Sequence, residues 1–141
     1  MTRVYWDTML FVYWLEGHPD RASKVQQIFE KMEQRGDMLC TSIFTMGEVL
    51  VAPYRQGSAE RVRQVRDFFR TSVPDLVPFT EETANRYGQI RATNRVTPPD
   101  AIHLASAASA GVDLFLTNDR RLRGLVIPGI HFIAGMDSDI L

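Results

Sequence analysis

Short apolar segments alternate with longer amphipathic segments throughout this chain of 141 residues. RVYW at 3–6, DMLCTS at 37–42 and DLFLT at 113–117 have the length and composition of buried strands. The intervening segments carry apolar residues at helical spacing, for example Val25, Ile28, Phe29 and Met32. Strands that alternate with helices form a parallel sheet covered by helices on both faces. We therefore predict a three-layer, doubly wound α/β/α sandwich with a mainly parallel sheet, forming a single domain over residues 1–141.

The expected helix boundaries follow from capping residues. Asp20, Ser42 and Thr80 each precede an amphipathic segment and are predicted to cap a helix. Gly17 and Gly36 follow such segments and are predicted to end a helix. Two further short strands are expected, in SVPDLVPF and near IHFIAG.

The composition narrows the possible classes of protein. Hydrophobic residues make up 45% and charged residues 23% of the chain, close to the averages for globular proteins, which argues against disorder. No apolar run approaches the roughly 20 residues that span a bilayer, and no signal-peptide cleavage site is evident, so we expect a cytoplasmic protein without membrane contact. A single cysteine, Cys40, fits a reducing compartment. With a net charge of -1, a nucleic-acid partner would have to contact a local basic patch.

Four acidic residues from separate parts of the chain are expected to meet at one edge of the sheet. Asp7 directly follows the first strand, and Asp119 follows DLFLT by two residues. Asp100 lies in the first turn of the helix that begins at PPD, and Glu48 lies between one and two turns into the helix after the second strand. Helices that cover a parallel sheet begin at the edge where its strands end, which is also where ligands bind.

Each of these acids also has a purely structural interpretation. Asp7 could cap a helix, Asp100 could be a helix-start acid, Asp119 could close a turn and Glu48 could be solvated. Together, however, they would repel one another and raise one another's pKa unless a cation compensated them, and neither lysine nor histidine is expected among them. Oxygen ligands suit Mg²⁺ or Mn²⁺ better than zinc, and such ions activate water for phosphodiester hydrolysis.

In four of its motifs the sequence resembles the PIN-domain family of metal-dependent ribonucleases, and within it the VapC-type toxins of bacterial and archaeal toxin–antitoxin pairs. The motifs are VYWDT, SIFTMGE, PPDAIHLASA and FLTND, and the resemblance covers nearly the whole chain. It implies RNA as the substrate, a cognate antitoxin that inserts near the site, and a homodimer. It also implies that Mg²⁺ or Mn²⁺ is held by four catalytic acids: Asp7, Glu48, Asp100 and Asp119.

The same motifs suggest residues that support the acids. Thr117 and Asn118 are expected to orient Asp119 or a metal-bound water, and Ser42 is expected to lie behind the site. One position departs from the pattern: Met9 stands two residues after the first acid, where a small polar residue is common. His103 follows Asp100 by one turn and could touch the site, although a packed or supporting histidine is the simpler interpretation.

Other residues are candidates for partner contacts. Arg120 and Arg121 adjoin the fourth acid and Arg91 precedes the third, so we predict that these arginines contact RNA phosphates. The arginines between 55 and 70 are more simply a solvated helix face. The first helix and strand are rich in aromatic residues, most expected in the core and some available for a dimer face: Tyr5, Trp6, Phe11, Tyr13 and Trp14.

The sequence thus favours an Mg²⁺-dependent endoribonuclease, with two alternatives. The first is a PIN-like module that binds RNA or a protein without cleaving it. The second is an α/β phosphatase with an aspartate nucleophile after the first strand, but such enzymes commonly need a second aspartate where Met9 stands.

Overall fold

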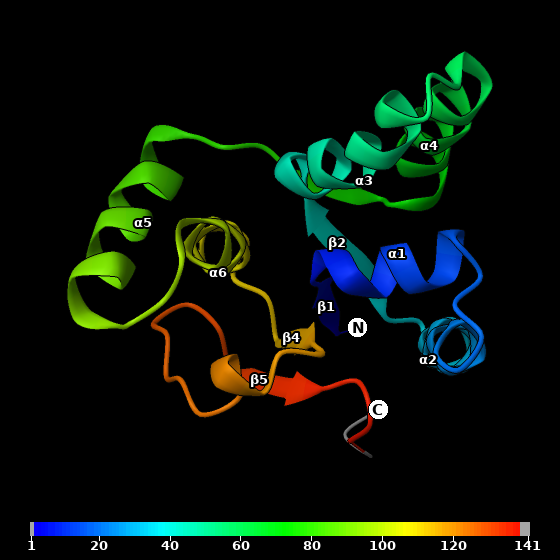
Figure 1. Cartoon of the computed structure of the whole chain (residues 1–141). Helices are drawn as coiled ribbons and strands as arrows, with labels where there is room; N and C mark the ends of the chain where they lie inside the picture. Colours follow the sequence, from blue (N-terminus) through cyan, green and yellow to red (C-terminus); the bar gives the residue numbers. More distant parts are fainter. Residues whose placement is uncertain (1, 139–141) are drawn as a thin grey trace.

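The computed structural model describes residues 2–138, in which a parallel sheet forms the centre of the molecule (Figure 1). All four strand pairings are parallel, in the order β3-β2-β1-β4-β5. Because the chain starts in the middle and builds outwards in both directions, the sheet is doubly wound, as predicted. The strands are β1 (Arg3–Trp6), β2 (Met38–Ser42), β3 (Asp75–Val77), β4 (Leu114–Thr117) and β5 (Phe132–Gly135).

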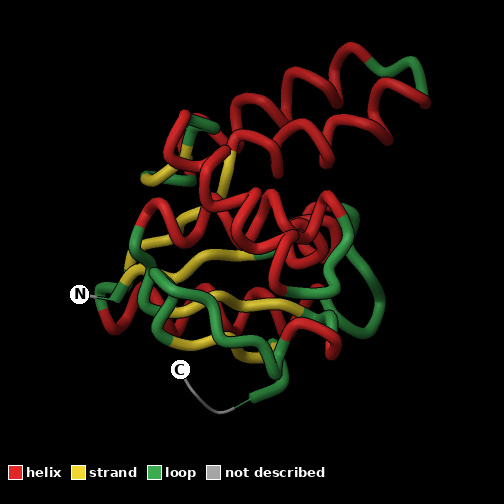
Figure 2. The backbone as a smooth tube through the Cα atoms, turned by 90° about the vertical axis from the view of Figure 1, so that its left-hand side faces the viewer, coloured by secondary structure: helices red, strands yellow, loops and turns green. Residues whose placement is uncertain are grey.

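Helices cover both faces of the sheet, which confirms the predicted three-layer fold. Helices α5 and α6 lie on one side, while α1 and α2 lie on the other (Figure 1). Helices α3 and α4 form a hairpin that extends beyond the sheet (Figure 2). The bounds are α1 (Thr8–Leu15), α2 (Ala22–Arg35), α3 (Ile43–Arg55), α4 (Ala59–Ser72), α5 (Glu81–Thr93), α6 (Pro98–Ala110) and a short 3-10 helix η1 (Arg120–Leu122).

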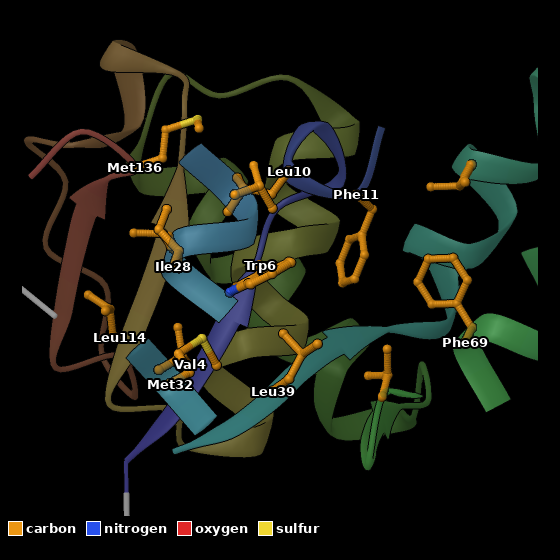
Figure 3. Packing of buried hydrophobic residues seen from close by; sticks show 14 of the residues in the cluster. Val4, Trp6, Leu10, Phe11, Ile28, Met32, Leu39, Phe69, Leu114 and Met136 are labelled. Atoms are coloured by element: carbon orange, nitrogen blue, oxygen red, sulfur yellow. The ribbon is translucent and has the colours of Figure 1, made fainter. Parts of the chain in front are cut away.

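Successive residues of β1 belong to different cores because side chains alternate across a strand. Trp6 packs in a large cluster with Phe11 and Phe69 from α1 and α4 (Figure 3). Tyr5 packs in a second cluster under α5 and α6, where its ring stacks on Phe115 at 5.1 Å between centroids. The alanines of α6 line this second cluster and keep the helix close to the sheet.

Most of the predicted capping residues act as expected. The Ser42 and Thr80 side chains accept hydrogen bonds from backbone N–H groups in the first turns of α3 and α5. Gly36 ends α2 in the left-handed region, with φ 73°. The prediction for Asp20 was wrong, because α2 begins one residue later without a side-chain cap. His18 Nδ1 instead accepts the N–H groups of Asp20 and the following residue, each at 3.2 Å, and so closes the turn.

Burial also answers two questions raised by the composition. Tyr5, Trp6 and Phe11 are fully buried in the core, as expected for most of these aromatic residues, while Tyr13 and Trp14 are only partly buried. Cys40 is buried in β2 and packs in the second cluster. No helix in the described part of the chain has the length and apolar character needed to cross a membrane.

Candidate functional site

A pocket of about 450 Å³ lies at the carboxyl end of the central strands, and the four predicted acids line it together. Asp7 directly follows β1, and Glu48 lies on α3. Asp100 lies in the first turn of α6, and Asp119 lies in the segment after β4. The remaining lining residues are Thr8, Met9, Tyr13, Pro99, His103, Asn118, Arg120 and Arg121.

Asp7 is nearly buried and fixed through both of its carboxylate oxygens. Its Oδ1 accepts the Thr8 N–H at 2.9 Å, so Asp7 caps α1. Its Oδ2 accepts the hydroxyl of Thr117 at 2.8 Å. The β1–β4 register aligns Trp6 with Leu116, which sets the two following residues side by side. The structural role of Asp7 and its place in the pocket are therefore compatible.

Glu48 is held through one oxygen by two donors. Its Oε1 lies 2.5 Å from Thr8 Oγ1 and 2.6 Å from His103 Nε2. Partial burial would raise the pKa of Glu48, but the hydrogen bonds from His103 and Thr8 outweigh it and lower the pKa below the ordinary value. Glu48 is therefore ionised at neutral pH and is not merely a solvated helix residue.

Asp100 lies in the first turn of α6, which Thr97 caps. Burial raises the pKa of Asp100, and the negative charges of Asp7 and Asp119 raise it further, against the lowering effect of Thr97 and Arg121. This mutual repulsion means that the acids from β1, α6 and the segment after β4 share one electrostatic environment.

Asp119 is bound by an arginine two residues further along. Arg121 donates from its backbone N–H and its Nε to Asp119 Oδ1, at 2.9 and 3.0 Å, and from Nη2 to Oδ2 at 2.6 Å. These hydrogen bonds lower the pKa of Asp119 below its ordinary value. Asp119 thereby caps the 3-10 helix η1 while it lines the pocket.

The expected supporting residues lie at different distances from the acids. Thr117 contacts two of them, since its Oγ1 donates to Asp7 and accepts the Asp119 N–H at 3.0 Å. Asn118 lines the pocket, but its side-chain amide donates to Tyr13 Oη at 3.0 Å. Ser42 contacts Thr45 in the first turn of α3 and has no hydrogen bond to any of the four acids among the described residues.

The candidate RNA-contacting arginines border the acids on one side. Arg120 and Arg121 line the acidic pocket. Arg91 lies outside it, in an adjoining pocket of about 360 Å³ that also includes Arg95, Asp100 and Arg121. Asp100 and Arg121 line both pockets, so the two pockets adjoin each other at these residues.

The expectation that neither lysine nor histidine lies among the acids was wrong for histidine, because His103 contacts Glu48. Arg121, predicted to adjoin the fourth acid, pairs with Asp119. The sequence did place His103 one helical turn after Asp100, on the same face of the helix. Sequence reasoning gave too little weight to that spacing, because it does not reveal whether the face is turned towards the pocket or the core.

The donors in the pocket suit a divalent cation in their chemistry. Carboxylate and hydroxyl oxygens are the ligands that Mg²⁺ and Mn²⁺ prefer. Asp7 and Asp100 have no basic atom within hydrogen-bond distance among the described residues, since His103 is 3.7 Å from the first and Arg121 is 3.8 Å from the second. Residues 2–138 contain no group of three or more Asp, Glu, His or Cys side chains gathered as the ligands of one ion. The donor types fit a cation in their chemistry, while their spacing gathers no three of them around one point in the described residues; Asp7 and Asp100 are the least compensated acids.

The fold and the pocket together define a class of protein: a doubly wound parallel α/β domain with an acidic pocket at the carboxyl ends of its strands. Comparison with known families agrees with this class. The PIN domain family profile matches residues 4–126. The chain therefore belongs to the PIN domain family.

Several solved structures have a similar fold. A chain of VapBC2 from Rickettsia felis, bound to a DNA fragment from its promoter, gives a TM-score of 0.74 at 16% identity, over 94% of this chain and 98% of that chain. VapBC-1 from nontypeable Haemophilus influenzae gives 0.70 at 18%, over 96% and 99%. A toxin–antitoxin complex from Klebsiella pneumoniae gives 0.65 at 21%, over 90% and 94%. The search of curated proteins found no significant match.

Proposed function

We propose that this protein is an Mg²⁺- or Mn²⁺-dependent endoribonuclease that acts in the cytoplasm as the toxin of a toxin–antitoxin pair. The main support is the convergence of four acids in one pocket of a PIN domain, at least one of them destabilised by its acidic neighbours. The structural neighbours named above come from VapBC or other toxin–antitoxin complexes, which supports a cognate antitoxin as partner. A homodimer is part of the proposal through the family resemblance alone.

In this proposal the acids have different tasks. Asp7 and Asp100 hold the cation most directly, because no basic group within residues 2–138 lies at hydrogen-bond distance from them. Glu48 and Asp119 complete the acidic environment, each from a carboxylate already fixed by hydrogen bonds. A bound Mg²⁺ would supply an activated water and offset the charge of the phosphodiester. Thr117 keeps Asp7 in place by donating to its Oδ2.

The arginines beside the acids are proposed to bind RNA phosphates. Arg120 and Arg121 line the acidic pocket, and Arg91 lies along the adjoining one. The Arg121 guanidinium is largely exposed, so it can exchange part of its contact with Asp119 for a phosphate oxygen.

Purified protein should cleave RNA in the presence of Mg²⁺ or Mn²⁺ and stop when the ion is chelated. Asp7→Asn and Asp100→Asn should each reduce the cleavage rate by about a thousandfold or more, because both remove a charge that holds the ion. Asp20→Asn is the matched control, since Asp20 is exposed and outside the pocket. Undiminished cleavage by both Asp7→Asn and Asp100→Asn would disprove the mechanism.

A PIN-domain module that binds RNA or protein without cleavage is the second candidate. Its support is that Glu48 already accepts hydrogen bonds from Thr8 and His103, and that Asp119 is paired with Arg121, which reduces the need for a cation. Calorimetric titration with Mn²⁺ separates the two proposals. A nuclease should bind the ion and lose binding in Asp7→Asn, whereas a binding module should take up RNA with no ion bound.

A further inference from the structure

His103 is the most enclosed polar group at the pocket. It is only 2% exposed, and both ring nitrogens have partners. Nδ1 lies 2.8 Å from the Tyr5 hydroxyl, and Nε2 lies 2.6 Å from Glu48 Oε1. The partners come from β1 and α3, while His103 itself lies on α6. One imidazole ring thus joins three elements that are distant in sequence.

The partners determine which nitrogen carries the proton. A carboxylate oxygen accepts hydrogen bonds, so His103 Nε2, at 2.6 Å from Glu48 Oε1, is the donor and carries the hydrogen. In the neutral ring Nδ1 is then an acceptor, and the donor to it is the Tyr5 hydroxyl. Tyr5 suits this task because its phenol is a hydrogen-bond donor and is fully buried at 2.8 Å from Nδ1. Stacking on Phe115 holds the Tyr5 ring in place.

This arrangement of donors leaves Glu48 Oε2 free to bind another group. Thr8 and His103 both approach Oε1, and no side chain of the described residues makes a hydrogen bond to Oε2. A carboxylate held by two donors on one oxygen has a fixed orientation, so the second oxygen keeps its direction in the pocket. The same group without these donors would rotate freely at the end of a flexible side chain.

We propose that His103 is a positioning residue that orients the Glu48 carboxylate, and that Tyr5 selects the tautomer in which His103 can do so. The purpose of this orientation, which is to present Glu48 Oε2 to the divalent cation, rests on the proposed function. The hydrogen-bond order itself can be measured in the protein whether or not it cleaves RNA.

The first experiment uses the wild-type protein labelled with ¹⁵N and no added metal. Long-range ¹H–¹⁵N spectra at neutral pH distinguish a protonated imidazole nitrogen from a bare one. We expect His103 to show a protonated Nε2 and a bare Nδ1, and Tyr5→Phe to change this pattern because Nδ1 loses its donor. A protonated Nδ1 in the wild type would overturn the proposal, and so would an unchanged spectrum in Tyr5→Phe.

The second experiment compares two substitutions at position 103. His103→Gln keeps an amide N–H near the position of Nε2, whereas His103→Leu fills similar space without a donor. We expect His103→Leu to weaken Mn²⁺ binding about tenfold in calorimetry and to lower kcat by about ten- to a hundredfold, with little change in KM. His103→Gln should recover most of both losses. Equal losses in the two variants, or none in His103→Leu, would show that His103 only fills space.

The two readouts distinguish failure of this inference from failure of the proposed function. If the wild type binds Mn²⁺ without cleaving RNA, the proposed function fails, while weaker binding by His103→Leu still supports the positioning role. If the wild type cleaves RNA and His103→Leu cleaves equally well, the positioning role fails and the proposed function stands. Circular dichroism melting of each variant verifies that it is folded.

Discussion

The two sides of the acidic pocket hold their carboxylates by different means. On one side, Glu48 is bound by Thr8 and by His103, whose side chain is only 3% exposed. On the other, Asp119 is bound by Arg121, whose side chain is 74% exposed. The first partner is enclosed between helices and sheet, whereas the second reaches across the surface.

This difference sets how easily each side can rearrange. A buried hydrogen bond is strong in its low-dielectric surroundings, and breaking it leaves polar groups without partners. An exposed ion pair contributes little to stability and is weakened further by salt. Glu48 is therefore fixed before any substrate arrives, while Asp119 and Arg121 can exchange partners when one binds. We infer that the first side sets the geometry of the site and the second adapts to the substrate.

Thr117 joins Asp7 to the Asp119 side of the pocket, and among the residues that support the acids its removal should have the largest effect. Its buried hydroxyl donates to Asp7 and accepts the Asp119 N–H. Thr117→Val keeps the shape of the side chain but leaves both partners unsatisfied. We expect kcat for RNA cleavage to fall by about a hundredfold, at the upper end of the effect of residues that orient ligands.

Thr117→Ser is the matched control because it keeps the hydroxyl and removes only a methyl group. It should retain a rate within about fivefold of the wild type, given the usual cost of removing one buried methyl group. Equal losses in the valine and serine variants would show that packing, rather than the hydrogen bonds, is what matters at this position.

Removal of Arg121 tests the adaptable side. We expect Arg121→Ala to raise KM for RNA by about tenfold or less and to reduce the dependence of log Kd on log salt by about 0.7, as for one lost phosphate contact to a single strand. Mn²⁺ affinity should stay the same or rise, because Asp119 loses a competing cation. For His103→Leu the opposite is expected: weaker Mn²⁺ binding and a lower kcat, with little change in KM.

Arg66→Ala provides the control for the loss of one positive charge. Arg66 is exposed on α4 and lies outside the acidic pocket and the one adjoining it. Filter binding at several salt concentrations measures the slope for both variants. If Arg121→Ala and Arg66→Ala have the same slope, Arg121 contributes no specific phosphate contact.

Much of this arrangement follows from local sequence rules. An acid placed one or two residues after a parallel strand must lie at the carboxyl edge of the sheet, so the positions of Asp7 and Asp119 could be predicted without coordinates. The alternation of Tyr5 and Trp6 likewise fixes which core each ring joins. These rules depend only on the direction of the backbone and the alternation of side chains along a strand. Both can be inferred from residue types and their spacing.

The partners of the acids depend on features that spacing does not encode. His103 reaches Glu48 only because α6 packs with one particular rotation about its axis, which is set by its contacts with the sheet. Arg121 has several rotatable bonds, and its fork could equally have pointed into solvent. At Asp20, the unforeseen competitor was a histidine nitrogen that accepts the same kind of N–H group. To predict each of these contacts, one must know how the side chains are oriented, and residue spacing does not give that information.

Substitution of Ser42 tests whether the first turn of α3 helps to hold Glu48 in place. Its hydroxyl accepts the Thr45 N–H at 3.1 Å and so caps the first turn of α3, the helix that carries Glu48. We expect Ser42→Ala to lower the free energy of unfolding by about 1 kcal/mol, as for other lost caps, while kcat well below Tm changes less than about twofold. Urea denaturation and initial rates measure the two effects. A loss of activity with unchanged stability would instead assign Ser42 a direct role at the acids.

The smallest expected effect concerns the repulsion that Asp100 experiences in the pocket. Its folded pKa lies above the ordinary value, chiefly through burial and then through Asp7 and Asp119, so its contribution to stability is present at low pH and lost as the pH rises through that folded pKa. Relative to the wild type, Asp100→Asn should therefore gain stability as the pH rises from about 3.5 to 7, with a change in Tm difference of about 1–3 °C.

A divalent ion should offset the same repulsion in the wild type. Added Mn²⁺ should raise the wild-type Tm at neutral pH but affect Asp100→Asn much less, because ligand binding to the folded state stabilises it in proportion to affinity. Melting curves at several pH values, with and without Mn²⁺, give both comparisons, and Asp20→Asn corrects for the loss of one negative charge. If the Tm difference between Asp100→Asn and the wild type moved in the opposite direction with pH, the acids would not repel one another in the folded protein. The reason for placing a cation between them would then disappear.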